Sequence, residues 1–129
     1  MRMTENKIGT LIVETATNLH QELGPGLYES VYETILAHEL SELGLSVQRQ
    51  VPIALQYKGI DFEEAFRADL IVGEKVIIEL KSVEQISKSH KKQILTYLRL
   101  SGLKLGYVLN FGGSLMKDGI ARVVNGLEE

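Results

Sequence analysis

The 129-residue sequence contains no cysteine, no tryptophan and only two prolines, Pro25 and Pro52. The lack of cysteine excludes disulfide bonds, thiolate zinc sites and cysteine nucleophiles. Any metal ion must then be held by carboxylates, carbonyl oxygens or the three histidines, which favours hard ions such as Mg²⁺ or Mn²⁺.

Long apolar runs and targeting signals are also missing. No run approaches the ~18 residues of a membrane span, and the polar N-terminus is not followed by a signal-type hydrophobic segment. We therefore expect a cytoplasmic protein that does not contact membranes. The sequence likewise has no phosphate-binding glycine loop of the Walker type, no dinucleotide fingerprint and no nucleophile elbow.

Positively charged residues are fewer than negatively charged ones. The chain has 14 Lys and Arg against 17 Asp and Glu, which gives a formal net charge of -3. This balance argues against tight non-specific binding of nucleic acids, because such binding needs many Lys and Arg contacts to phosphate. It is compatible with an enzyme that meets its substrate through one local basic face. The length and the hydrophobic share of 44% suit a single domain over residues 1–129.

The spacing of apolar residues predicts two helices, three strands, a third helix and two more strands. We expect helices over 4–23, 27–43 and 87–100, and strands over 45–57, 62–72, 75–81, 103–111 and 120–124. Gly24 and Gly44 are natural ends for the first two helices. A helix that crosses between the third and fourth strands implies an α/β fold, with a mixed central sheet covered by helices on both faces.

Three charged residues lie in the otherwise apolar second and third strands: Asp69, Glu79 and Lys81. Glu79 and Lys81 are two residues apart and so share a strand face. If the hairpin loop is Gly73-Glu74-Lys75, Asp69 lies opposite Glu79, with the two Cβ atoms roughly 5 Å apart. A two-residue loop would send Asp69 to the other face of the sheet.

Regular strand alternation also places Arg67 and Ile71 on the face of Asp69. Two facing carboxylates repel each other unless a cation lies between them, so the pattern favours a metal site. A metal there could activate water and offset the charge of a phosphate, while Lys81 positions or deprotonates the water or stabilises the transition state. The alternative is a cross-strand ion cluster that only fixes the register of the strands.

These residues resemble a known pattern. Asp69 followed by Glu79-Leu80-Lys81 is similar to the Asp…Glu-x-Lys signature of the PD-(D/E)XK nuclease superfamily, although Ala68 replaces the proline of that name. The segment 26–32 reads G-x-x-E-x-x-Y, as in the GxxExxY protein family of that superfamily. The resemblance covers roughly Ile8 to Val124. It implies a restriction-endonuclease-like core with the order α-α-β-β-β-α-β-β.

The resemblance also implies roles for the site residues. Asp69 and Glu79 would bind Mg²⁺ or Mn²⁺, and Leu80 would lend its backbone carbonyl. Lys81 would be the catalytic lysine, and Glu29 an outer ligand or a water-holding carboxylate. Taken alone, Glu29 has an ordinary alternative, as a charge that complements the positive N-terminal end of its helix.

Polar residues of the third helix extend the candidate site. Gln93 and Tyr97 are four apart on one helix face, and this spacing resembles a motif that follows the catalytic lysine in RecB-type nucleases, where it implies contact with substrate or active-site groups. Lys88 and Lys92 belong to a local basic run that would contact phosphates. The alternatives are the polar edge of an amphipathic helix and a solvated helix face.

The resemblance therefore implies a metal-dependent nuclease that hydrolyses DNA, or less readily RNA, with a metal-activated water. One site per chain calls for a homodimer to cut both strands of a duplex, whereas nicking does not. The alternative is a non-hydrolytic domain that binds nucleic acid or a protein partner and keeps the nuclease fold.

Overall fold

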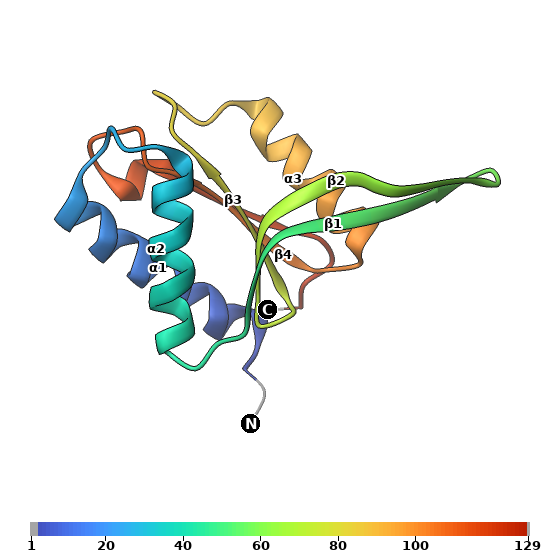
Figure 1. Ribbon diagram of the computed structural model, residues 1–129, viewed down its shortest axis with the longest axis horizontal. Coiled ribbons are helices and arrows are strands. Elements are labelled where there is room, and N and C mark those ends of the chain that lie inside the picture. The colour runs from blue at the N-terminus through green and yellow to red at the C-terminus, as the bar shows by residue number, and fades with distance from the viewer. Residues whose placement is uncertain (1–2, 129) are drawn as a thin grey trace.

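The computed structural model describes residues 3–128 and has an α/β fold built on one five-stranded sheet (Figure 1). The helices are α1 (Glu5–Leu23), α2 (Glu29–Glu42), α3 (Lys88–Ser101) and a short 3-10 helix, η1 (Met116–Gly119). The strands are β1 (Val47–Tyr57), β2 (Ile60–Val72), β3 (Val76–Lys81), β4 (Leu105–Asn110) and β5 (Ile120–Val124). The predicted order is confirmed, and η1 lies directly before the last strand. Within the described part of the chain, no helix is long and apolar enough to cross a membrane.

The ends of α1 follow from its sequence. The side-chain oxygen of Thr4 accepts a hydrogen bond from the N–H of Lys7 at 3.1 Å, which caps the first turn. At the other end Gly24 has φ of 71°, a left-handed conformation that glycine adopts without a steric penalty.

Tyr32 closes the corner between α1 and α2. Its hydroxyl donates to the carbonyl of Gly24 at 2.6 Å and accepts the N–H of Leu27 at 3.2 Å. Gly26 has φ of 106°, so the chain is not helical there. For these reasons α2 begins at Glu29 rather than at Leu27, where the sequence predicts its start.

The strand order in the sheet is β1-β2-β3-β4-β5. β3 and β4 are parallel and joined by α3, whereas the other neighbouring pairs are antiparallel. The sheet is therefore mixed, as the helical crossover predicts. Because β3 and β4 are parallel, their C-terminal ends at Lys81 and Asn110 lie side by side.

Helices cover both faces of the sheet, as the sequence predicts (Figure 1). Residues of β3 alternate between the two layers: Ile78 and Leu80 pack with α1 and α2, while Ile77 packs with α3. By the same alternation Glu79 and Lys81 lie on the α3 side of the sheet.

Beyond the body of the molecule β1 and β2 continue as a two-stranded arm (Figure 1), and regular alternation breaks where the arm begins. Ala68 and Ile71 are three residues apart, yet both pack with α3. The break lies at Asp69, near Gln50 of the paired strand, which has a left-handed φ of 50°. The prediction that Arg67 shares a face with Ile71 is therefore wrong, because the strands change face at this point.

Candidate active site

The β2–β3 hairpin has the register that brings Asp69 towards Glu79. Its loop is Gly73-Glu74-Lys75, whose first residue has φ of 61°, and Val72 pairs with Val76 across it. The three-residue loop and the register predicted from the sequence are both confirmed. The two strands then run in step towards the acidic residues.

At Asp69 and Glu79, hydrogen bonds from backbone N–H groups to side chains take the place of backbone-to-backbone hydrogen bonds between β2 and β3. The backbone N–H of Asp69 donates to Oε1 of Glu79 at 3.1 Å. In return the backbone N–H of Leu80 donates to Oδ2 of Asp69 at 2.9 Å. Each carboxyl group is thus fixed by the strand that carries the other, and the two lie within hydrogen-bonding reach of one another.

The Glu79 carboxyl is electrostatically strained. Its side chain is 7% exposed, and burial raises its pKa from 4.5 to about 8, with the neighbouring Asp69 charge as the second cause. The hydrogen bond from the Asp69 N–H and the positive charge of Lys81 lower this pKa but do not cancel the rise. A cation placed between the two carboxylates would remove much of this cost.

Lys81 is the last residue of β3 and lies two residues after Glu79, on the same face of the strand. It is partly exposed, and its charge acts on Glu79. The structure therefore brings together the three charges that the sequence singled out, with Lys81 at the solvent side.

Tyr97 and Gln93 of α3 lie beside this group. The Tyr97 ring stacks on Phe66 of β2, with centroids 3.7 Å apart and planes 4° apart. Burial raises the pKa of Tyr97, and the charges of Glu79 and Asp69 raise it further, while a hydrogen bond from the Gln93 side chain lowers it. The two residues thus lie on one side of α3, as their spacing predicts, and Tyr97 is close enough to the acidic pair for both of its charges to act on it.

The basic run lies at the start of α3. The Ser87 side chain accepts the N–H of His90 at 3.2 Å, and the His90 ring accepts the N–H of Ser87 at 3.1 Å. This capping box begins the helix and leaves Lys88 and Lys92 exposed. Their predicted contact with phosphate stays a prediction.

On α2 the carboxylate of Glu33 bonds to Arg49 and Gln50 beside the site, while the predicted role of Glu29 stays a prediction. Glu29 lies exposed in the first turn, whereas Glu33 is 7% exposed and faces the start of the arm. Oε2 of Glu33 accepts Arg49 Nη2 at 3.0 Å and Nε at 3.2 Å. Sequence reasoning overlooked Glu33, because the helix pattern alone does not say which acidic residue of α2 faces the sheet.

Gln50 links Glu33 to the acidic pair. Its amide nitrogen donates to Oε1 of Glu33 at 2.6 Å and lies 3.3 Å from Oδ1 of Asp69. One amide group with two N–H donors thus stands between two carboxylates. The left-handed backbone of Gln50 is the local feature that aims this side chain at them.

The donor set suits a hard cation with water in its shell. Within residues 3–128, no group of three His, Cys, Asp or Glu side chains is arranged to hold a metal. Mg²⁺ usually takes only one or two protein carboxylates and keeps several waters. Asp69 and Glu79 therefore fit such an ion, with Leu80 adjacent to both.

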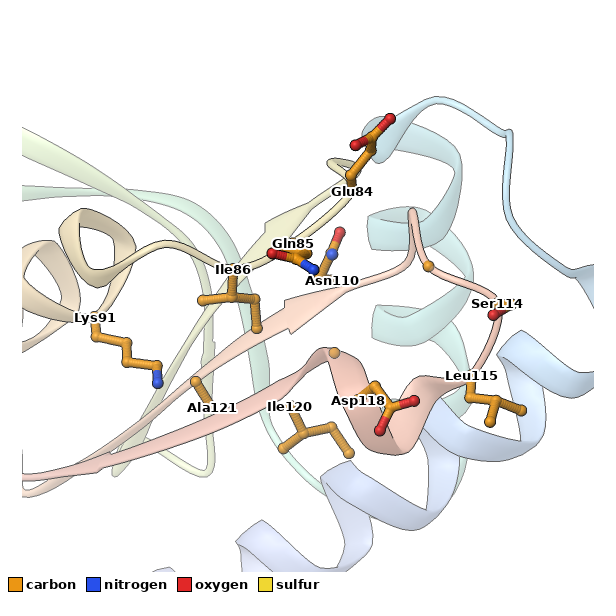
Figure 2. A pocket seen from close by; sticks show the side chains of 12 residues that line it. Glu84, Gln85, Ile86, Lys91, Asn110, Ser114, Leu115, Asp118, Ile120 and Ala121 are labelled. Atoms are coloured by element: carbon orange, nitrogen blue, oxygen red, sulfur yellow. The ribbon is translucent and has the colours of Figure 1, made fainter.

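A separate pocket of about 500 Å³ opens at the C-terminal ends of β3 and β4 (Figure 2). Its lining includes Lys91 of α3 and Asp118 of η1. Asn110 shapes it by bonding to the N–H and the carbonyl of Val83, at 2.9 and 2.8 Å. Since Asn110 pairs with Lys81, the pocket neighbours the acidic pair without containing it.

A family model described as the PD-(D/E)XK nuclease superfamily matches residues 6–123, a range that holds every candidate site residue. No curated protein matches the chain significantly. A solved structure titled "Crystal structure of SSO0001" is 17% identical, with a TM-score of 0.42, and the match covers 94% of this chain and 79% of that one.

Proposed function

The chain belongs to the PD-(D/E)XK nuclease superfamily, and we propose that it is a Mg²⁺- or Mn²⁺-dependent nuclease that hydrolyses DNA in preference to RNA. The crossed hydrogen bonds between Asp69 and Glu79 carry this proposal, because they hold the buried carboxyl group of Glu79 beside the half-buried one of Asp69. The raised pKa of Glu79 reflects the cost of that arrangement in the absence of a cation.

In the proposed mechanism Asp69, Glu79 and the Leu80 carbonyl would hold the ion. A divalent ion bound there would supply an acidified water and offset the charge of the scissile phosphate. Lys81 lies on the same face and positions or deprotonates the attacking water, or donates to the phosphate oxygens as charge develops on them.

Residues of α3 would position the substrate. Tyr97 and Gln93 flank the acidic pair and offer a hydroxyl and an amide to the sugar-phosphate backbone. Lys88 and Lys92 continue along the exposed side of the helix, where they would contact neighbouring phosphates.

Residues of α2 and β1 would position Asp69. Glu33 and Arg49 fix the Gln50 amide, which in turn bonds to Asp69. We propose Glu33 as the outer carboxylate of the site. Glu29, one turn earlier and exposed, stays a second candidate for this role.

The proposal is tested by a cleavage assay on single-stranded DNA, duplex DNA and RNA, in Mg²⁺, Mn²⁺ or EDTA. We expect metal-dependent cleavage of DNA that is lost in Lys81→Ala and retained in Lys58→Ala, a matched change at the tip of the arm. Nicked rather than broken duplex would identify a monomer, whereas double-strand breaks would require a homodimer.

The net charge of -3 supports one other function. A domain that kept the nuclease fold but did not hydrolyse phosphodiester bonds would bind nucleic acid or a protein partner without turning over a substrate. Absence of cleavage by the wild type on every substrate, together with measurable binding, would favour this alternative.

A further inference from the structure

Charge is distributed unevenly along the chain. Residues 8–48, which form most of α1 and all of α2, contain no Lys or Arg. Six of the 17 acidic residues lie there, while the rest of the chain carries all 14 Lys and Arg against the other 11. These six are Glu14, Glu22, Glu29, Glu33, Glu39 and Glu42. Residues 8–48 are therefore strongly negative, whereas the rest of the chain has a formal excess of three positive charges, 14 against 11.

A groove of about 440 Å³ runs between α1 and α2 within this negative segment. Aliphatic side chains from both helices line it, and two of them are unusually open to solvent: Leu23 is 43% exposed and Leu43 is 49% exposed. Leu19 and Ile35 complete the apolar lining. An exposed apolar groove of this kind is typical of a surface that receives another apolar segment.

Carboxylates ring the apolar lining. Glu22 of α1 and Glu39 and Glu42 of α2 all border the groove, and all three are exposed. The ring of His38 lies 3.7 Å from the carboxylate of Glu42, and both side chains are 69% exposed. The rim of the groove is thus acidic on both sides.

The negative charge around the groove limits the kinds of molecule that can bind there. Nucleic acids and anionic membranes are repelled by a surface that has carboxylates and no Lys or Arg. A second copy docked through the same face would bring two negative layers together. A segment with aliphatic anchors flanked by Lys and Arg matches both the lining and the rim.

We propose that the α1–α2 groove binds a basic amphipathic helix of a partner protein. Aliphatic side chains spaced i, i+3, i+4 and i+7 enter between Leu23 and Leu43, and flanking Lys and Arg pair with Glu22, Glu39 and Glu42. The two helices α1 and α2 lie on the face of the sheet opposite α3 (Figure 1), so a partner in the groove would leave the acidic pair open to a substrate.

The test uses the full chain and a fluorescent designed peptide, a helix with leucines at those spacings and lysines on both flanks. We expect saturable binding in fluorescence anisotropy, weakened at least about tenfold by Glu39→Lys/Glu42→Lys. Asp61→Lys/Glu63→Lys is the matched control, because it makes the same charge change on the exposed arm and should leave the affinity unchanged. Thermal melts of both variants check that each is folded.

A second peptide distinguishes binding that needs the apolar side chains from binding through charge alone. Replacing its leucines with serines keeps every lysine and should abolish binding. Equal binding of the serine peptide, or equal weakening by the control variant, would overturn the proposal in favour of unspecific attraction. The proposal would also be overturned if the wild type bound phosphatidylserine vesicles or duplex DNA but not the peptide, and if Glu39→Lys/Glu42→Lys strengthened that binding no more than the control variant does. None of these outcomes depends on nuclease activity.

Discussion

Asp69 and Glu79 are locked together by crossed bonds: the N–H of Asp69 donates to Glu79 at 3.1 Å, and the N–H that follows Glu79 donates to Asp69 at 2.9 Å. Neither carboxyl group can turn away from the other without losing a bond to the opposite strand. The geometry that makes the pair repulsive is therefore built into the hairpin, and a cation offers relief that side-chain rotation cannot.

The first prediction concerns Glu79 and pH. Its pKa is 4.5 when unfolded and about 8 when folded, so between these values the folded protein binds a proton that the unfolded protein lacks. Stability of the metal-free protein should then fall as pH rises from about 5 to about 8. Glu79→Gln should remove this part of the slope and raise the Tm at pH 8, in thermal melts across that range. Glu74→Gln, an exposed change in the same hairpin, should follow the wild type; a parallel response of both variants would contradict the raised pKa.

The second prediction concerns Gln50, whose amide stands between Glu33 and Asp69. Gln50→Ala leaves the two carboxylates without their shared donor, so the metal-free protein should lose about 1 kcal/mol of stability. The rise in Tm on adding Mg²⁺ should become larger, because no amide has to give way to the ion. Gln56→Ala on the arm is the control. An unchanged or smaller metal effect in Gln50→Ala would show that the amide does not compete with the cation.

The third prediction separates the two carboxylates of α2. Glu33→Gln breaks an ion pair between the buried Glu33 and Arg49, whose side chain is 44% exposed, and should cost about 1–2 kcal/mol in urea unfolding. Glu29→Gln, at an exposed position, should stay within about 0.5 kcal/mol of the wild type. Cleavage rates should also fall at least about tenfold in Glu33→Gln only. A larger loss of cleavage in Glu29→Gln would assign the outer carboxylate to Glu29.

The fourth prediction gives Tyr32 a structural role. Its ring is fully buried and stacks on Phe111 at 4.4 Å, and its hydroxyl donates to Gly24 at 2.6 Å. Tyr32→Phe keeps the stacking and removes the hydroxyl, so it should cost about 1–2 kcal/mol without changing the cleavage rate per folded molecule. Tyr28→Phe, at a side chain that is 83% exposed, should be neutral. A loss of activity in folded Tyr32→Phe would instead place the hydroxyl in the catalytic site.

Much of this fold follows from local signals in the sequence. Apolar spacing and glycines give the order of helices and strands, and the loop Gly73-Glu74-Lys75 gives the register of β2 against β3. That register is sufficient to predict that Asp69 and Glu79 meet. Interactions between residues that are near one another in the sequence determine these features, so they can be predicted from the sequence.

Tertiary packing decides the features that the sequence did not predict. Glu33 reaches the site because α2 packs against β1, where Arg49 and Gln50 meet it, and the helix pattern alone does not say which acidic residue faces the sheet. The change of face at Gln50 depends on one residue with a left-handed backbone, a conformation that glutamine rarely adopts. Such a break leaves no trace in the alternation of apolar residues.

Mn²⁺ binding tests the central claim most directly, that Asp69 and Glu79 form a divalent-cation site. Electron paramagnetic resonance would count the Mn²⁺ bound by wild type, Asp69→Asn, Glu79→Gln and the arm control Asp61→Asn. The account predicts one ion for each wild-type and control chain, and loss of that ion in both site variants. Binding in Asp69→Asn and Glu79→Gln that equals the wild type, or no binding by the wild type at millimolar Mn²⁺, would contradict it.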